Sequence, residues 1–173
     1  MNIACTLAPG RGDTDLLLHG VAQSLISRGY HPAGTVQINT QSAETGPCDM
    51  DVKVLPDGPV IRISQSLGHG ARGCRLDPAA LERAVGHVAA GLADGADCLI
   101  VNKFGKHEAD GRGFRPVIAD ALSRGIPVLV GLSRLNAAAF LEFSGGIAAQ
   151  LPPRSADLER WLSCAMDAAK APA

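Results

Sequence analysis

The chain alternates short apolar runs with stretches in which apolar residues recur every three or four positions. The apolar runs predict strands, which cover residues 1–7, 33–38, 98–101, 126–132 and 147–151. The stretches with helical spacing predict helices, which cover residues 16–26, 78–92, 114–124, 136–143 and 157–169. Fully apolar strands that alternate with amphipathic helices are typical of a mostly parallel sheet covered on both faces. We therefore predict a three-layer α/β fold.

One segment follows a different pattern. Residues 50–55 and 60–64 alternate apolar and polar positions, and Pro56-Asp57-Gly58 lies between them. Two strands of period two around such turn residues predict a β-hairpin, inserted at an edge of the sheet. The chain has 173 residues, of which 46% are hydrophobic, so it is long enough to bury one sizeable core. We expect residues 1–173 to form a single domain.

Composition excludes several classes of partner. The net charge of −1 provides no basic field for nucleic acid or an anionic membrane, and aromatic residues make up only 3%. The five cysteines show no C-x-x-C pair, and Cys5 and Cys98 lie in apolar runs as small core residues. No leader and no apolar run near the ~20 residues of a membrane span is present. We expect a cytoplasmic protein, for which a protein partner or a homo-oligomer stays open.

Residues 10–14 join the first predicted strand to the first predicted helix, which is where a phosphate-binding loop lies. Against the pattern G-x-x-x-x-G-K-S/T, Gly12 and Thr14 match, whereas Leu7 replaces the first glycine and Asp13 replaces the lysine. The loop is thus a degenerate Walker A sequence. Its glycines let backbone N–H groups turn toward an anion at the helix end.

Two carboxylates at the start of this helix, Asp13 and Asp15, leave other interpretations open. They suit the positive end of the helix dipole and could simply cap a tight turn, with Asp13 or Thr14 as the N-cap. They could also hold a cation.

A second polar segment, Asn102 to Gly113, follows the strand at 98–101. In a P-loop protein this strand ends in an acid that holds Mg²⁺, often followed by a glutamate. Here Asn102 and Lys103 occupy those places, and Lys103, Lys106 and Arg112 make the segment cationic. The cations favour an oxyanion, or they are solvated loop charges. A third polar loop, Ser133 to Asn136, is expected at the same sheet edge, because ligands of α/β sheets bind at the carboxyl ends of strands.

A scattered set of thiol, imidazole and carboxylate groups could bind a borderline metal: Cys48, Asp49, Asp51, His69 and Cys74, with Arg75 beside them. Its spacing matches no established ligand pattern, so Cys48, His69 and Cys74 are only weak metal candidates. We predict no metal site and identify no cofactor.

Two segments resemble an uncharacterised bacterial domain family of unknown function, and the resemblance extends over essentially the whole chain. The segments are Ile100–Glu108 with the following Gly111–Phe114, and Gly68–Asp77. Members of that family occur beside nitrogenase and molybdenum-transport genes, and some are labelled as molybdate-transporter ATP-binding proteins. A more distant similarity is to thermophilic-type P-loop nucleoside triphosphatases, whose Walker B strand ends in Asp-Glu-Ile-Gly-x-Met-Glu. Only Gly105 and Glu108 match that pattern here.

These similarities imply a P-loop-NTPase-like fold and a link to molybdenum metabolism and nitrogen fixation. Because both phosphate-handling segments are altered, we predict an accessory protein that binds a nucleotide or an oxyanion such as molybdate without hydrolysing it. One alternative is an active Mg²⁺-dependent nucleoside triphosphatase, with Glu108 or Asp15 holding the metal and Lys103 replacing the missing lysine. Another is a protein-interaction scaffold. The predicted anion- or nucleotide-binding residues are Gly10, Arg11, Gly12, Asp13, Thr14, Lys103, Lys106 and Arg112.

Overall fold

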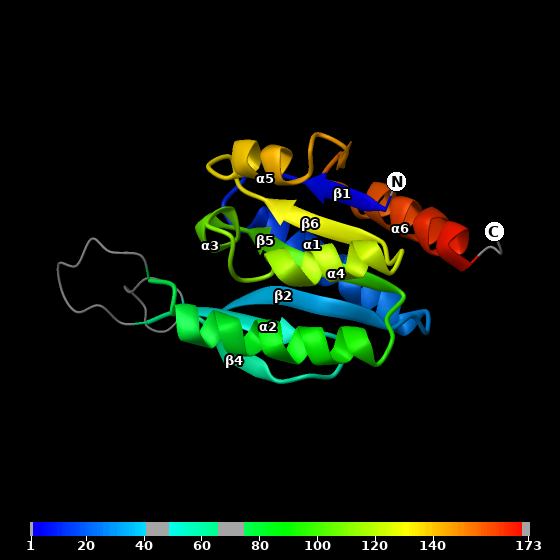
Figure 1. Cartoon of the computed structure of the whole chain (residues 1–173). Coiled ribbons are helices and arrows are strands. Elements are labelled where there is room, and N and C mark those ends of the chain that lie inside the picture. The colour runs from blue at the N-terminus through cyan, green and yellow to red at the C-terminus, as the bar shows by residue number, and fades with distance from the viewer. Residues whose placement is uncertain (1, 41–48, 66–74, 171–173) are drawn as a thin grey trace.

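The computed structural model describes residues 2–40, 49–65 and 75–170, and all its strands lie in one sheet (Figure 1). The strands are β1 (Ile3–Thr6), β2 (Pro32–Thr40), β3 (Asp49–Val54), β4 (Val60–Arg62), β5 (Cys98–Phe104), β6 (Val128–Leu132) and β7 (Ala149–Leu151). The helices are α1 (Asp13–Ser27), α2 (Pro78–Ala93), α3 (Lys106–Ala109), α4 (Arg115–Ser123), α5 (Ala137–Phe143) and α6 (Ser155–Lys170).

The sheet has the order β4-β3-β2-β5-β6-β1-β7. The strands from β2 to β7 in this order pair in parallel, whereas β3 and β4 form an antiparallel hairpin that ends at the sheet edge. Helices α1 and α6 cover one face and α2 and α4 the other (Figure 1). The predicted α/β class, the mostly parallel sheet and the edge hairpin are therefore confirmed.

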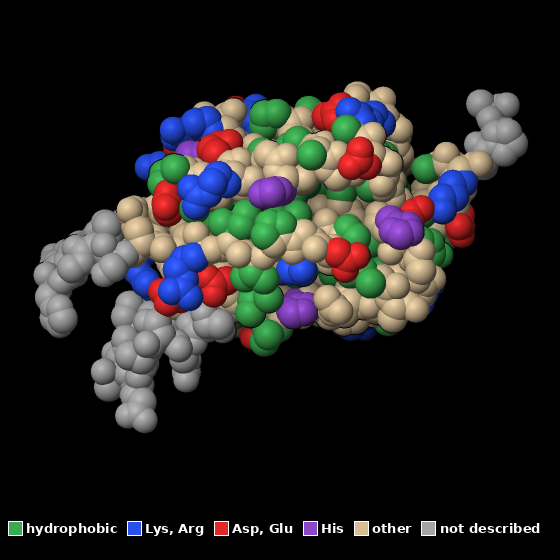
Figure 2. Space-filling view, turned by 90° about the horizontal axis from the view of Figure 1, so that it is seen from below, with side chains coloured by type: hydrophobic (Ala, Val, Ile, Leu, Met, Phe, Trp, Pro, Cys, Tyr) green, Lys and Arg blue, Asp and Glu red, His purple; other side chains and the backbone are tan. Residues whose placement is uncertain are grey.

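Both faces of the central strands are buried, which explains their continuous apolar sequences. In β5, Leu99 and Val101 pack under α2 and α4, while Cys98 and Ile100 pack under α1 and α6. On the side of the molecule where the β4 edge lies, acidic and basic side chains are interspersed rather than gathered by sign (Figure 2). Within the described residues, no helix combines the length and hydrophobicity needed to cross a bilayer.

Cys5 and Cys98 are buried, as their apolar surroundings predict. Burial raises the pKa of the Cys5 thiol, and burial together with the nearby Asp97 carboxylate raises the pKa of Cys98 to about 12. Both thiols are therefore protonated packing groups rather than nucleophiles.

The start of α2 follows its sequence signal: Asp77 is the N-cap and accepts a hydrogen bond from the Ala80 N–H, and Pro78 is the first helical residue. The prediction that Asp13 or Thr14 caps α1 is wrong. The N-cap is Gly12, whose φ of 85° lies in the left-handed region that glycine adopts at little cost. Asp13 and Thr14 bond backward to the preceding loop instead.

Strand β5 extends three residues beyond its predicted end at Val101, so the segment predicted as a loop from Asn102 to Gly113 begins inside the sheet. Phe104 explains the extension, because its ring is fully buried and lies 5.3 Å from the ring of Phe140 and 5.5 Å from that of Phe143. The same segment also contains the short helix α3. Strand β2 likewise continues to Thr40, past the predicted end at Ile38.

The last turn of α6 is tied to the start of β5 by an ion pair, in which Lys170 Nζ lies 2.8 Å from Asp97 Oδ1. Asp97 Oδ2 also accepts a hydrogen bond of 2.8 Å from the His31 N–H. Burial by itself would raise the pKa of Asp97, but the His31 hydrogen bond and Lys170 outweigh it, so this pKa lies below its usual value. The same pair raises the pKa of Lys170.

Because the pKa of Asp97 is lower in the folded state, its carboxylate stabilises the fold fully at pH values above the unfolded pKa of about 3.9. This contribution is lost as the pH falls through the pKa of the folded state. Asp97→Asn should therefore cost up to about 1 kcal/mol at pH 7, since the lysine is exposed, and progressively less below about pH 4. Urea unfolding of both proteins at pH 7 and pH 3 measures this. A difference that stays constant between the two pH values would contradict the assignment.

Candidate functional site

A cavity of about 290 Å³ opens at the carboxyl ends of three neighbouring strands, β1, β5 and β6. The loop after β1 forms one wall, Lys103 near the end of β5 forms another, and residues 132–134 after β6 form the third. Ligands of open α/β sheets bind at this edge, where helix N-termini and strand ends meet. We describe it as the first-loop cavity.

The loop that leads into α1 is closed on itself by two side chains. The Gly10 N–H donates to Asp13 Oδ2 at 3.1 Å, and the Ala8 N–H donates to Thr14 Oγ1 at 3.0 Å. A Cβ atom at position 10 would lie 2.2 Å from Asp13 Oδ2, so only glycine permits this contact. One N–H of the glycine-rich loop is thus occupied by a carboxylate of the same chain.

A β-bulge shapes the end of β5. Val101 pairs with Val130 and Phe104 with Leu132, so two residues of β5 lie opposite the single residue Gly131 of β6. A Cβ at Gly131 would lie 2.1 Å from the Asn102 carbonyl oxygen, which is why a glycine is required there. Bulges of this kind redirect side chains next to functional sites.

The redirected Asn102 links β2 to α1. Its Oδ1 accepts from the Gln37 N–H at 2.9 Å, and its Nδ2 donates to Asp15 Oδ1 at 2.8 Å. Asn102 and Asp15 are only 3% and 4% exposed. The amide serves as donor and acceptor at once, which an ionised aspartate at this position cannot do.

Lys103 brings a cation to the cavity, and its Nζ lies 4.0 Å from Asp15 Oδ1. Arg11 and Arg134 also line the cavity, and neither has an ion-pair partner in the part of the chain that the structure describes. Among the described residues, three cationic residues and one acid, Asp15, therefore line the cavity. A small cavity with this excess of positive charge is chemically suited to an anion.

The structure brings together five of the predicted binding residues around this cavity: Gly10, Arg11, Gly12, Thr14 and Lys103. Asp13 does not line it but bonds to the Gly10 N–H beside it. Sequence reasoning missed Ser133 and Arg134 as lining residues, although the polar loop 133–136 after a predicted strand was the signal for them.

Lys106 and Arg112 do not line the first-loop cavity. Lys106 is the exposed first residue of α3. Arg112 pairs with Asp110 at 3.6 Å and lines a different cavity of about 560 Å³, beside His107 and Glu82. There, Glu82 Oε1 lies 3.0 Å from His107 Nε2 and accepts from the Gly113 N–H at 3.1 Å.

Glu108, one candidate for a metal-holding carboxylate, is buried away from the first-loop cavity. Its Oε2 accepts from the Gly105 N–H at 2.8 Å and its Oε1 from the Phe114 N–H at 3.2 Å. A Cβ at Gly113 would lie 2.2 Å from Oε1, so the turn closes tightly around this carboxylate. Glu108 organises the segment that follows β5.

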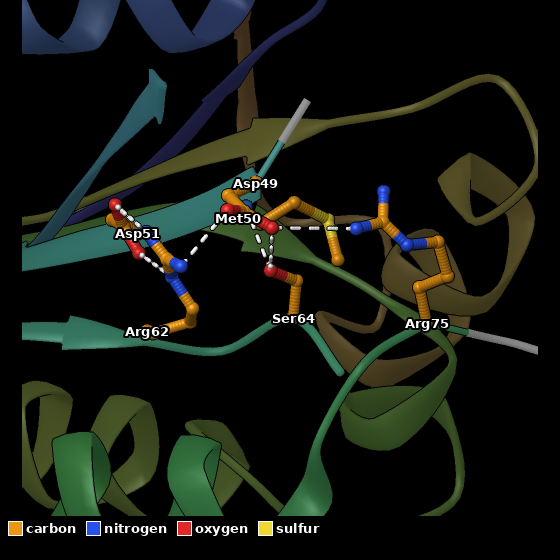
Figure 3. Close-up of polar contacts among 6 residues, drawn as sticks. All are labelled: Asp49, Met50, Asp51, Arg62, Ser64 and Arg75. Carbon is orange, nitrogen blue, oxygen red and sulfur yellow. Dashed lines mark hydrogen bonds and ion pairs between the residues drawn. The ribbon is translucent and has the colours of Figure 1, made fainter. Parts of the chain in front are cut away.

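The weak metal candidates Cys48, His69 and Cys74 lie outside the described residues. The acids near them in sequence are held by arginines at the edge hairpin (Figure 3). Arg62 lies 2.8 Å from Asp49 and 3.0 Å from Asp51, and Arg75 lies 3.4 Å from Asp49. Among the described residues, no group of three or more histidine, cysteine or acidic side chains is placed to hold a metal ion.

Comparisons with known proteins agree with this fold. The chain is 37% identical over 159 residues to "Molybdenum import ATP-binding protein ModC 2" of Bradyrhizobium diazoefficiens, covering 92% of this chain but only 18% of that relative. The solved "Solution Structure of a Human Cancer-Related Nucleoside Triphosphatase" superposes with a TM-score of 0.59 at 22% identity, over 94% of this chain and 96% of that one. The structural likeness establishes a nucleoside-triphosphatase type of fold.

A family model described as "Protein of unknown function (DUF2478)" matches residues 3–161, which is nearly the whole chain. The chain therefore belongs to this family.

Proposed function

We propose that this member of the DUF2478 family binds a small oxyanion, or the phosphate group of a nucleotide, in the first-loop cavity without hydrolysing it. The observation that carries the proposal is that Arg11, Lys103 and Arg134 line one cavity together with the glycine-rich loop at the start of α1. The positive end of a helix and nearby cations together favour a bound anion. The cavity volume of about 290 Å³ suits one tetrahedral anion better than a whole nucleotide.

The residues at the end of β5 support the proposal that the bound group is not hydrolysed. In P-loop hydrolases a carboxylate there helps to hold Mg²⁺ near the phosphates. Here Asn102 has both functional atoms engaged, with Gln37 and Asp15, and the next residue is a cation. Asp15 is tied to Asn102 and Lys103, and Glu108 caps a turn elsewhere. Neither carboxylate is arranged as the missing metal-holding acid.

The biological context comes from the relative in Bradyrhizobium, whose name describes import of molybdenum and binding of ATP. We place this chain beside such a transport system as an accessory protein, with nucleotides and molybdate as the first ligands to test. The chain spans less than a fifth of that relative, so the relative's activity is not transferred here.

Calorimetric titration with ATP, GTP, phosphate and molybdate tests binding. Lys103→Ala should weaken binding of whichever anion binds by about tenfold or more, because it removes a cavity cation worth at least ~1.4 kcal/mol. Lys106→Ala is the matched control: it removes the same charge three residues later, outside the cavity lining, and should change affinity less than about twofold. No heat with any anion, or equal losses in both variants, would contradict the proposed site.

Hydrolysis is tested separately by release of phosphate from ATP and GTP with and without Mg²⁺. We expect no release above the protein-free rate. Mg²⁺-dependent release that disappears in Lys103→Ala would instead support the alternative of an active nucleoside triphosphatase.

A second candidate role, contact with a protein partner, is favoured by two leucines next to cavity residues. Leu135 is 93% exposed and Leu16 is 74% exposed, and they follow Arg134 and Asp15 in sequence. Single exposed leucines are common, but two that adjoin cavity residues in sequence match the apolar centre that protein interfaces have inside a polar rim. Co-purification of the molybdenum-import ATP-binding protein of the same cell with the wild type, and its loss with Leu135→Asp, would support this role.

A further inference from the structure

We infer that the first-loop cavity selects an oxyanion that still carries a proton, such as inorganic phosphate, over a fully ionised one such as molybdate or sulfate. The selecting residue is Asp15, the carboxylate that lines the cavity among the described residues. This inference rests on the proposed function, since it names the ligand class of the same site.

Asp15 is held in place rather than free to turn away. Its side chain is 6% exposed, Asn102 Nδ2 donates to its Oδ1 at 2.8 Å, and Lys103 Nζ lies 4.0 Å from the same atom. An anion that reaches Lys103 therefore comes close to the Asp15 carboxylate. Because the Asp15 carboxylate is almost completely buried, its interaction with an anion that comes this close is stronger than between two ions in solution.

An ionised carboxylate can only accept hydrogen bonds. A hydrogen phosphate ion donates its O–H to such a group in a short, charge-assisted bond. Molybdate and sulfate have no proton to donate at neutral pH, so their oxygens face the carboxylate with only repulsion between them. The same residue thus favours one class of oxyanion and disfavours the other.

Asp13, in the same first turn of α1, adds to the selection. Its carboxylate occupies the Gly10 N–H, a donor that a phosphate-binding loop would otherwise direct at an anion. With that donor engaged, the loop has less to offset the repulsion by Asp15. A fully ionised anion therefore loses more binding affinity than a protonated one, because the protonated anion still donates a hydrogen bond to Asp15 through its own O–H.

The test is the ratio of affinities, measured by calorimetry for phosphate, sulfate and molybdate at pH 7.5. In the wild type, phosphate should bind at least tenfold more tightly than sulfate or molybdate. Asp15→Asn keeps an oxygen that accepts from Asn102 but adds an N–H donor, so the ratio should fall to about threefold or less. Asp110→Asn, which neutralises an exposed acid outside the cavity, should leave the ratio unchanged.

A second readout needs only the wild-type protein, in case Asp15→Asn does not fold. The phosphate of AMP is a monoester and loses its last proton near pH 6, whereas inorganic phosphate keeps one proton up to pH 8 and beyond. AMP affinity should therefore drop about tenfold between pH 5.5 and 7.5, relative to inorganic phosphate. A fall shared equally by both ligands would overturn the inference.

Different results would overturn the anion site and the selection by Asp15. Binding of molybdate or sulfate as tight as phosphate, with the same ratio in Asp15→Asn, overturns the selection by Asp15 and leaves the anion site standing. No binding of any oxyanion overturns both.

Discussion

Asn102→Asp is expected to lower the free energy of unfolding by about 3 kcal/mol or more at pH 7. The change places a carboxylate where Asn102 Nδ2 now donates to Asp15 Oδ1 at 2.8 Å. Both side chains are almost completely buried, so the two negative charges would meet with little water between them. The donor that satisfies Asp15 would be lost at the same time. One of the two carboxylates would have to take up a proton or leave the core.

Urea unfolding of the single variants and of the double variant Asp15→Asn/Asn102→Asp measures this coupling. The double variant restores one donor and one acceptor between the two positions, and should recover most of the loss. The deficit of Asn102→Asp should also shrink as the pH falls toward 4, because protonation of one carboxylate relieves the repulsion. A double variant no more stable than Asn102→Asp alone would contradict the assigned hydrogen bond.

This coupling accounts for the lack of an acid at position 102. An acid at position 102, as in a hydrolase, is incompatible with the acid at position 15, because only a donor at one end satisfies the buried pair. Lys103 then adds a positive charge at 4.0 Å from Asp15. The acid that faces the altered end of β5 is thus Asp15, and not Asp13, which replaces the Walker A lysine.

Gly131→Ala is expected to destabilise the protein by about 2–3 kcal/mol and to impair anion binding at the same time. The new methyl group would lie 2.1 Å from the carbonyl oxygen of Asn102 and 2.8 Å from Leu18 Cδ1. The first of these atoms is backbone, so relief requires β5 and β6 to separate at the bulge. That movement displaces both Asn102 and Lys103, which follow each other at this point of β5.

Gly20→Ala provides the matched control, because Gly20 lies in α1 with no atom within 4 Å of its expected Cβ. It should stabilise the protein by about 0.5–1 kcal/mol through helix propensity and leave anion binding unchanged. Thermal or urea unfolding together with calorimetry separates the two effects. Gly131→Ala that matches the wild type in both stability and affinity would show that the bulge tolerates a side chain.

The layered fold could be predicted from sequence because its signals are local. Apolar runs such as 126–132 bury both faces of a strand, helical spacing buries one face of each helix, and Asp77-Pro78 caps α2 through atoms a few residues apart. The edge hairpin follows equally from period-two strands around a turn. These features depend on contacts between residues that are close together in the chain, and a sequence pattern shows such contacts directly.

The composition of the site could be predicted only in part. The glycine-rich loop and Lys103 were identifiable because strand ends of a parallel sheet meet at one edge. The sequence could not predict that Lys106 and Arg112 lie outside the cavity lining. Their positions depend on α3 and on the turn around Glu108, which follow β5. Arg134 enters the site only through the position of β6 between β5 and β1.

By itself, then, the sequence determined a mostly parallel α/β protein with an altered phosphate loop after one strand and cations at the end of another. The tertiary structure decided which charges meet. A one-residue bulge opposite Gly131 directs Asn102 to Asp15 and leaves Lys103 at the cavity, although these partners are 87 and 88 positions apart from Asp15 in the chain. Which of these side chains meet depends on the register between strands and on close packing at the bulge, where shifts of a few tenths of an ångström matter. No local pattern of hydrophobic and polar residues encodes either of these.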